Sequence, residues 1–441
     1  MKKICFVFAF VLSCFWNSEI QAQMTLYYMD RLPQIQLYNP ALIPKVGFFL
    51  ELPIIGNHQV ELNNSGFNLG QFLDFSDNLD NANYNPNEFV NSIGDYNKTT
   101  GELRTNLLNF GFSLKNNGYF SMGFAVRNFI DLTAPADIVY LLEDNEKIAN
   151  KMPLAINGMN VRMNTFSQLS ITYARTIGTK LTVGITPKII GALGGIYSER
   201  LNAELDKTDQ GEFDTKFDGR VQIGLPVAIN PQAIGSNGQL DTNEDLLDPD
   251  WAKNLYVGSA FQNATLAVDL GANYQLNEIW SFSASLLDLG KSGWKKYAYD
   301  ISYNGENATV KDLSKLKMKI PVKIFIGADY KLSPDWNAGF LFRNVGYESG
   351  NFSSATFSLN GYVGRMLSTS VSYTAGHRFD NLGFGLRLRF FPGTDLYLVT
   401  DNVLQAFNYK NIQYSRVSFG INLAFGVSSK ISGTAEIDEE L

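Results

Sequence analysis

The chain of 441 residues has only 2 cysteines and 2 histidines. Cys5 and Cys14 both lie near the N-terminus, so the rest of the chain has no thiols from which disulfides could form. A metal site of the usual His/Cys kind needs more ligands than His58 and His377 can supply. We therefore expect no metal and no cofactor, and we interpret both histidines as structural or solvent-facing residues.

Charged residues are also scarce, at 18% of the chain, where about 25% is usual for globular proteins. The net charge is −7, and no run of five or more basic residues occurs. Because an acidic excess repels phosphate, a nucleic-acid partner is not expected. Aromatic residues reach 13%, so a large apolar surface must be covered by protein or by lipid.

Long hydrophobic runs are missing after the N-terminal stretch, so no transmembrane helix is predicted there. The stretch itself is basic over residues 1–3, apolar over 4–15, and has Ala22 before a cut expected at Gln23. This pattern is typical of a secretory signal peptide, predicted over residues 1–22. An alternative makes Cys14 the acceptor of a lipoprotein cleavage box, but the apolar stretch before it is short.

Catalytic motifs are missing as well. The chain has no Gly-x-Ser-x-Gly elbow and no P-loop. A Ser-His-acid triad needs a base within hydrogen-bond reach of a serine, and His377 follows a strand-like stretch closely enough to leave a barrel hydrolase open. The chain is nevertheless not expected to be an enzyme.

From about residue 103, bulky apolar residues alternate with small or polar ones. Alternation of period two places the two sets on opposite faces of a β-sheet. One face is then apolar, and the other carries Gly, Ser, Thr, Asn and several charges. The windows with this pattern are 108–114, 120–126, 169–174, 181–186, 266–274, 282–286, 322–330, 336–342, 384–390 and 417–425.

The lengths and connections of these segments favour a membrane barrel over a soluble β-protein of the periplasm, which is kept as an alternative. The segments run about 9–12 residues, enough for a tilted strand to cross a bilayer. A tight turn at 115–118 contrasts with long connections at 130–163 and 228–260, as in outer-membrane barrels. Aromatic residues near segment ends suggest interfacial girdles, at Tyr119, Phe129, Tyr173, Tyr274, Tyr330, Tyr347, Phe391 and Tyr397.

The predicted fold class is therefore all-β: a transmembrane antiparallel β-barrel of about 14 strands, two either way, over residues 61–426. A sheet in hydrocarbon must close on itself, because every backbone donor and acceptor must be paired. Prolines disfavour a helix or a central strand over residues 24–44, so residues 23–60 are predicted to form a plug in the lumen. Residues 74–101 are expected to be a loop with one short helix at 88–93, and residues 427–441 an acidic tail.

Charges on the small-residue face are the candidates for a functional site in the lumen. They are Arg343, Arg387, Arg389, Asp269 and Asp329. Arg387 and Arg389 are two residues apart and point the same way; facing lipid, each would cost about 2–4 kcal/mol at mid-membrane. Facing inward, they could pair with a carboxylate such as Asp329 or Asp269, or contact an anionic ligand, and structural pairing is the simpler interpretation.

Residues 312–319 form a separate cationic stretch with three lysines. A solvated loop before the next strand is the simpler interpretation. Binding to anionic lipid head groups is the alternative.

Short motifs at both ends of the chain carry a family resemblance. The stretch Asn39, Pro40, Ala41 resembles the Asn-Pro-Ala motif in the plug of FadL/TodX-type outer-membrane transporters of hydrophobic compounds. The spacing of Ser418, Gly420, Leu423 and Phe425 resembles the terminal-strand signal read by the barrel-assembly machinery, although sixteen residues follow it. Together with residues 393–402, this ending resembles an uncharacterised Bacteroidetes family of FadL-related barrels.

The resemblance implies a place in the outer membrane of a Gram-negative cell and passive transport of small hydrophobic compounds past an N-terminal plug. The implied partners are outer-membrane lipid, the barrel-assembly machinery and hydrophobic small molecules. Related barrels of the PorV/PorQ type implicate secretion components instead, as docking or shuttle proteins. A non-transporting docking barrel in a secretion or cell-envelope complex is therefore the alternative function.

Overall fold

The computed structural model describes most of the chain. The described residues are 19–20, 24–78, 85–115, 117–142, 152–207, 213–234, 245, 247, 259–304, 307–375, 381–404, 410 and 412–426. The predicted cut before Gln23, the acidic tail at 427–441, His377 and most of the connection at 228–260 lie outside them.

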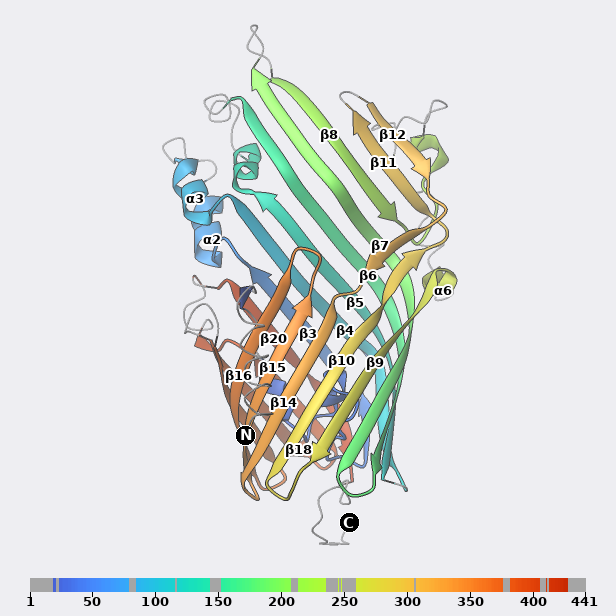
Figure 1. Ribbon diagram of the computed structural model, residues 1–441, viewed down its shortest axis with the longest axis vertical. Coiled ribbons are helices and arrows are strands. Elements are labelled where there is room, and N and C mark those ends of the chain that lie inside the picture. Colours follow the sequence, from blue (N-terminus) through green and yellow to red (C-terminus); the bar gives the residue numbers. More distant parts are fainter. Residues whose placement is uncertain are drawn as a thin grey trace, which may run out of the picture.

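Antiparallel strands form a closed ring (Figure 1). In ring order they are β4 (Tyr96–Leu114), β5 (Gly118–Pro135), β6 (Leu154–Ile177), β7 (Leu181–Lys207), β9 (Ala264–Gln275), β10 (Trp280–Trp294), β14 (Val322–Ser333), β15 (Trp336–Gly346), β16 (Asn351–Val363), β17 (Leu367–Ala375), β18 (Leu382–Phe391), β19 (Thr394–Thr400) and β20 (Tyr414–Phe425).

The ring closes through two short strands, β2 (Phe48–Glu51) and β3 (Asn57–Asn64). Each pairs with β20 on one side and β4 on the other, so the two share one position. With the thirteen strands above, the described residues make fourteen positions, which confirms the predicted barrel. The predicted boundary at residue 61 is wrong, because β2 and the first half of β3 already belong to the wall.

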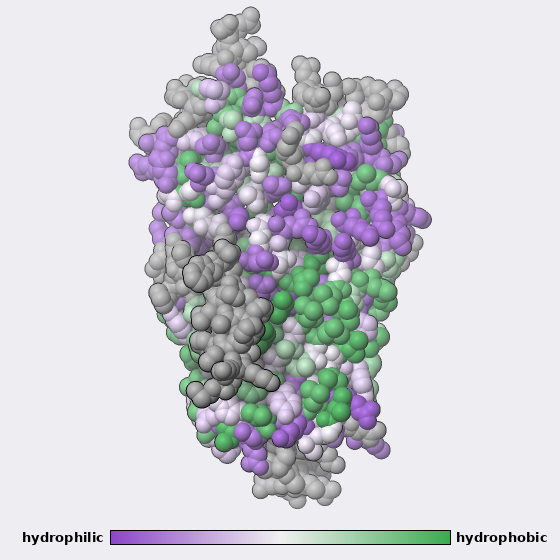
Figure 2. Space-filling view, viewed as in Figure 1, coloured by the Kyte–Doolittle hydropathy of each residue, from purple (hydrophilic) through white to green (hydrophobic). Residues whose placement is uncertain are grey.

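Alternation along each strand separates an apolar outer surface from a polar lumen. On β14, Ile324 and Ile326 are exposed on the outside, whereas Lys323 and Phe325 are buried inside. Figure 2 shows the resulting apolar surface on the lower half of the molecule. The exposed apolar side chains of the ring include Leu103, Leu108, Phe112, Ile171, Val183, Ile185, Ile189, Leu266, Leu270, Phe282, Ile324, Ile326, Phe357, Leu359, Val371, Phe384, Leu396, Leu398 and Phe419.

Several strands are much longer than the expected 9–12 residues. β6 has 24 residues and β7 has 27, so at about 3.3 Å per residue they extend far beyond a bilayer. The long connection predicted at 130–163 is therefore wrong, because β5 continues to Pro135 and β6 begins at Leu154. The strand ends at 131–135 and 154–162 pair because neighbouring strands continue beside them.

These extensions form a sheet above the ring (Figure 1). β7 pairs with β9 up to Gly191 and with β8 (Phe213–Gly224) from Gly195 onward. β8 pairs with β11 (Ala298–Asn304), which pairs with β12 (Asn307–Asp312). β13 (Leu316–Lys319) pairs with the upper end of β10.

Helices are short and lie in the connections. Between β3 and β4 are α2 (Leu69–Asp77) and α3 (Pro86–Ile93), where one helix was predicted; the amide side chain of Asn68 caps α2. The remaining small elements are η1 (Thr25–Tyr28), η2 (Pro33–Leu37), η3 (Ala136–Leu142), η4 (Pro231–Ala233), α6 (Ser259–Gln262) and β1 (Glu19–Ile20), which pairs with β16. Among the described residues, no helix has the length and apolar character needed to cross a membrane.

The aromatic residues near strand ends divide between the two faces. Tyr173 and Tyr274 are exposed on the outside, as an interfacial girdle requires. Tyr119 and Tyr397 are instead buried in the lumen, where Tyr119 stacks on Phe49. The prediction is wrong for these two tyrosines and for Phe129 and Tyr347, which pack in one buried cluster, because the face is decided by the parity of a residue along its strand and not by its nearness to the end.

Candidate functional site

Residues 24–45, named here the N-terminal segment, lie inside the ring. The segment contains η1 and η2, and its apolar side chains form one buried cluster with Leu287, Phe325, Leu341, Tyr397 and Val399. These wall residues come from β10, β14, β15 and β19, and all are inward-facing. Contacts with strands from so many sides of the barrel place the segment within the lumen.

Asn39 is the most extensively bonded residue of the segment and is fully buried. Its Oδ1 accepts from the backbone N–H of Ala41 at 2.9 Å, which fixes a tight turn. Its Nδ2 donates to Tyr27 Oη at 3.2 Å and to the carbonyl oxygens of Ala272 and Ala284, both at 3.3 Å. One amide therefore links the turn to both β9 and β10.

Two facing glycines of the wall make room for this turn. Gly184 of β7 and Gly271 of β9 are paired partners. A Cβ on Gly184 would lie 2.3 Å from the carbonyl carbon of Pro40, and one on Gly271 would lie 2.1 Å from Asn39 Oδ1. No side chain fits at that distance, so the Asn-Pro-Ala stretch requires glycine at both positions.

Further hydrogen bonds fix the rest of the segment through its neutral groups. Thr25 donates to Asp401 Oδ1 from its backbone N–H at 2.9 Å and from Oγ1 at 2.6 Å. Gln34 Nε2 donates to Glu51 Oε1 at 3.0 Å and to Asn422 Oδ1 at 2.8 Å. The charged residues of the segment stay nearer the surface, as in the ion pair between Lys45 and Asp30.

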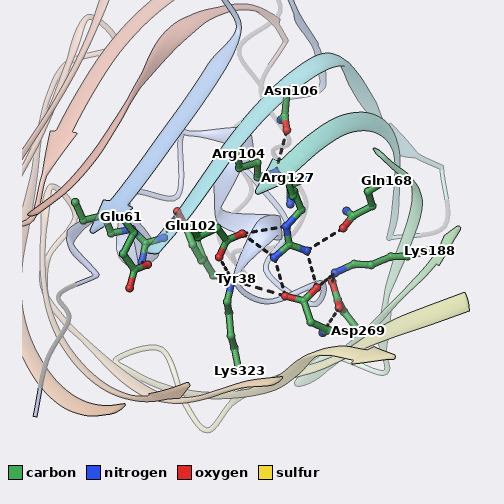
Figure 3. A network of polar contacts seen from close by, with 12 residues as sticks. Tyr38, Glu61, Glu102, Arg104, Asn106, Arg127, Gln168, Lys188, Asp269 and Lys323 are labelled. Carbon is green, nitrogen blue, oxygen red and sulfur yellow. Dashed lines mark hydrogen bonds and ion pairs between the residues drawn. The ribbon is translucent and has the colours of Figure 1, made fainter. Parts of the chain in front are cut away.

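Six ionisable side chains lie together in the lumen beyond the segment (Figure 3). This charge layer consists of Glu102, Arg127, Lys188, Asp269, Asp288 and Lys323, from β4, β5, β7, β9, β10 and β14. Three cations face three carboxylates, so the group is electrically balanced. Buried charges are stable only when they are paired and hydrogen-bonded.

Arg127 is the centre of the charge layer. Its Nη1 and Nη2 donate to the two oxygens of Asp288 at 2.7 and 2.9 Å. Nη2 also donates to Glu102 Oε1 at 2.7 Å, and Nη1 to Gln168 Oε1 at 2.9 Å. Since Glu102 and Asp288 are on opposite sides of the lumen, the guanidinium joins β4 and β5 to β10.

Two lysines complete the layer. Lys188 Nζ lies 2.7 Å from Asp288 Oδ1 and 2.6 Å from Asp269 Oδ2. Lys323 Nζ pairs with Glu102 Oε2. The layer therefore bridges the lumen in two directions and braces the wall.

Asp288 reaches the lumen because β10 contains a bulge. The register shifts between Leu286 and Leu289, and Asp288 adopts a φ of 63°. A bulge leaves one extra residue on its strand and redirects a side chain, so Leu287 and Asp288 both face inward. The backbone N–H of Asp288 donates to Asp269 Oδ1 at 2.7 Å, which stabilises an uncommon conformation for a non-glycine residue.

A second charged group, the arginine cluster, contacts the N-terminal segment. It consists of Glu61, Arg343, Asp401 and Arg416: Arg343 Nη2 lies 2.8 Å and Arg416 Nη1 lies 3.1 Å from Glu61. Arg416 Nη2 donates to Tyr38 Oη at 3.0 Å. Burial raises the pKa of Tyr38, so its hydroxyl stays neutral and can accept this bond.

Among the described residues, two of the small cavities lie beside these groups. One of about 20 Å³ is lined by Tyr38, Arg104, Arg127, Arg343 and Arg416 among others, a volume that holds about one water molecule. One of about 40 Å³ lies further from the segment, against Phe129, Tyr197, Met318 and Tyr347. Neither volume admits a ligand of ordinary size. Among the described residues, no group of His, Cys, Asp or Glu side chains is arranged to hold a metal ion.

Comparison with family models gives a match over residues 40–318 and 306–401, to a family described as "Family of unknown function (DUF5723)". These matches cover well over half of the chain. The chain belongs to the DUF5723 family.

Solved structures similar to this DUF5723 protein include membrane channels. The Pseudomonas putida toluene transporter TodX is 10% identical over 88% of this chain and 91% of its own, with a TM-score of 0.42. The Ralstonia pickettii toluene transporter TbuX is 9% identical over 90% and 95% of the two chains, with a TM-score of 0.37. A Rhodopseudomonas blastica porin mutant is 10% identical over 86% and 100%, with a TM-score of 0.25. No curated protein matches.

The lumen residues predicted from the DUF5723 sequence are all buried or half-buried, but they do not all meet. Arg343 lies in the arginine cluster and Asp269 in the charge layer. Arg387 and Arg389 share one partner, Asp395, with 2.7 Å from each arginine to Oδ1. Their predicted pairing with Asp329 or Asp269 is wrong, because Asp395 sits beside Arg389 in the β18–β19 register.

Asp329 bonds instead to the side-chain amide of Asn337 on β15. Most of the charged groups in the lumen were not predicted as site residues; they include Glu51, Glu61, Glu102, Arg104, Arg127, Lys188, Asp288, Asp395, Asp401 and Arg416. The sequence did carry a signal for many of them. An ionisable residue on the small-residue face of an alternating strand points into the lumen, where it must be paired with an opposite charge.

The residues of the predicted assembly signal lie on β20, the last strand of the described chain. Ser418 is buried in the lumen and Phe425 is exposed on the outside. A Cβ on Gly420 would lie 2.0 Å from the carbonyl oxygen of Gly56, so this glycine also makes room for the excursion between β2 and β3. The role of Ser418, Gly420, Leu423 and Phe425 in assembly stays a prediction.

Proposed function

We propose that this DUF5723 protein is an outer-membrane barrel that passively transports small hydrophobic compounds, with the N-terminal segment as its plug. One observation carries the proposal: residues 24–45 lie in the lumen and bond to the wall through their own neutral groups. Such a segment can leave the lumen without breaking a buried ion pair of the charge layer.

The outer surface supports a place in the membrane. Apolar side chains cover the lower half of the barrel (Figure 2), and the short turns that follow β4, β6, β9, β14, β16 and β18 lie at that end (Figure 1). Outer-membrane barrels have short periplasmic turns, so we assign the short-turn end to the periplasm. Trp280 and Tyr330, with ring centroids 4.7 Å apart, lie near this end at the level expected for an interfacial girdle.

The route of a solute begins on the other side of the charge layer. The cavity of about 40 Å³ presents Phe129, Tyr197, Met318 and Tyr347 to the lumen. Aromatic and thioether groups offer a weakly polar contact for a small apolar molecule. From there the compound passes beside the balanced charge layer only when the N-terminal segment has moved.

Deletion of residues 24–45 tests the proposal. The deleted variant should insert as a closed barrel, give higher single-channel conductance in planar bilayers and take up toluene into proteoliposomes faster than the full chain. Heat-dependent migration on gels checks that the barrel has formed. Unchanged conductance and uptake in a folded deletion variant would contradict the proposal.

A second function, docking of a partner in a secretion or cell-envelope complex, has one observation in its favour. The sheet of β6, β7, β8, β11 and β12 rises above the ring and offers a surface unrelated to any solute route. Extraction in mild detergent with cross-linking should then recover a stoichiometric partner. Loss of that partner on removal of the β11–β12 hairpin would favour docking over transport.

A further inference from the structure

Six lysines gather on the outer surface of the barrel where β10 and β13 pair. They are Lys291, Lys295, Lys296, Lys315, Lys317 and Lys319, and all are exposed. Lys291 lies directly opposite Lys319, and Lys317 lies opposite Gly293. Lys291 comes from a strand far from residues 312–319 in the sequence, so folding enlarges the cationic stretch into a patch.

The patch is unpaired and its lysines are exposed. Within the part of the chain that the structure describes, none of the six lysines makes an ion pair with an Asp or Glu side chain. The nearest carboxylates along the chain are Asp288, which pairs with Arg127 and Lys188 in the lumen, Asp300, which pairs with Arg220, and Asp312, at the end of β12. The patch therefore presents several free ammonium groups on one face.

The patch lies one membrane thickness from the aromatic pair at the short-turn end. Trp280 faces Tyr330 in the β10–β14 pairing, and Lys291 faces Lys319 in the β10–β13 pairing. Each lysine is eleven residues from the aromatic residue on its side of the sheet. With a rise of about 3.3 Å per residue and a tilt near 40°, the two levels are about 28 Å apart.

Between these two levels the outward side chains are apolar. On β10 they include Phe282 and Leu286, and on β14 they are Ile324 and Ile326. Figure 2 shows the hydrophilic surface beginning directly above the apolar one. The lysines therefore lie directly above the apolar outer surface, at the depth where lipid head groups are expected.

We propose that this lysine patch binds the phosphate groups of phosphorylated glycolipid in the outer leaflet. The inference rests on the membrane placement given under the proposed function, because that placement assigns the patch to the outer leaflet. Paired lysines offer several N–H donors to one phosphate, and the adjacent Ile324 and Leu286 offer apolar contact for acyl chains. A polybasic cluster at the membrane surface attracts anionic lipid through its summed charge.

Binding of diphosphorylated lipid A to the purified full-length protein in neutral detergent tests the proposal. The triple variant K291Q/K317Q/K319Q should bind lipid A at least tenfold more weakly than the unchanged protein, and its residual binding should be less sensitive to salt. Equal affinity of the triple variant and the unchanged protein would overturn the proposal. Inorganic phosphate should bind far more weakly than lipid A. Equal binding of the two would contradict the proposal that the ligand is a lipid.

A matched control removes the same charge at the other end. Lys115, Lys180 and Lys331 are exposed at the short turns, so K115Q/K180Q/K331Q should bind lipid A as the unchanged protein does. If the control variant lost the same affinity for lipid A, net charge alone would explain the binding, and the proposed role of the lysine patch would be wrong. Heat-dependent migration and toluene uptake, measured on the same variants, report separately on barrel formation and on the proposed function.

Discussion

The two halves of the lumen are filled in different ways. The half near the short turns holds the N-terminal segment, which bonds to the wall through neutral groups such as Asn39, Gln34 and Tyr28. The other half holds the charge layer, in which the wall fills its own interior with paired ions. The first filling can be removed as a unit, whereas the second cannot be removed without leaving charges unpaired.

The energies of these two fillings differ in kind. The hydrogen bonds of the segment contribute about 1 kcal/mol net where both groups are neutral, and about 1.5–3 kcal/mol where the wall partner is Asp401, Glu51 or Arg416. Water can replace the lost partner once the segment leaves. Removal of one member of a buried ion pair costs about 3–5 kcal/mol, because its partner stays behind without compensation. The charge layer therefore braces the wall, and under the proposed function the more weakly held segment would control access to the lumen.

The largest effect is expected for Asp288→Asn. This change leaves Arg127 and Lys188 facing a neutral amide, and the free energy of unfolding should fall by about 3–5 kcal/mol. Urea titration of the refolded barrel in vesicles, followed by tryptophan fluorescence, measures it. The control is Asp335→Asn in an exposed turn, whose free energy of unfolding should stay within about 0.5 kcal/mol of the unchanged protein. Equal stability of the two variants would mean that the charge layer does not brace the barrel.

Gly271→Val should disturb the segment and spare the charge layer. The new side chain overlaps Asn39 Oδ1, and overpacking of this kind costs about 1–3 kcal/mol. Single-channel conductance should rise as the segment is displaced. Gly194→Val is the control, since a Cβ there has its nearest neighbour, in Thr165, at 4.0 Å. Equal single-channel conductance of the two variants would mean that Gly271 does not help to hold the segment in place.

Asn39→Ala should weaken the same attachment more gently. Loss of its hydrogen bonds leaves the Ala41 N–H and two wall carbonyls short of a partner, at a cost of about 1–3 kcal/mol. Because Asn39 and Gly271 act on one contact, the double variant should show less than the sum of the two single effects on conductance. Full additivity would indicate two independent attachments.

The smallest effect is expected for Arg389→Gln. Asp395 is fully buried but keeps Arg387, so the variant should lose about 1 kcal/mol. Arg387→Gln should cost more, because the Arg387 side chain is 2% exposed and that of Arg389 is 20% exposed. Thermal unfolding of both variants in detergent gives the order; a reversed order would mean that burial does not set the cost of an ion pair in this lumen.

Much of the wall could be predicted from the sequence. The alternation of Ile324 and Ile326 with Lys323 and Phe325 gives both the strand and its two faces, because the side-chain period of a strand is two. The strand number followed from counting such stretches. The full strand lengths were not predicted, because Pro135 and Gly158 interrupt the short alternation in residues 131–135 and 154–162, and these residues pair with strands that continue beside them.

The candidate site was predictable only in part. Asn39, Pro40 and Ala41 were identified by their motif. Gly184 and Gly271, which make room for that stretch, could not be told from the other small residues of the lumen face. Arg387 and Arg389 were correctly placed inside, yet their partner was missed. A pattern along one strand says which way a charge points and nothing about which strand stands beside or opposite it.

The sequence by itself determined the alternating strands, the apolar belt and the inward direction of most charges, because these depend on neighbours within a few residues. The tertiary structure decided which charges meet, and the position of Asp288 is the plainest case. Its side chain faces inward because of a bulge in β10, and its partners Arg127 and Lys188 lie 161 and 100 residues away in the sequence. Such contacts exist only once the ring has closed, since closure alone brings opposite walls within hydrogen-bond distance.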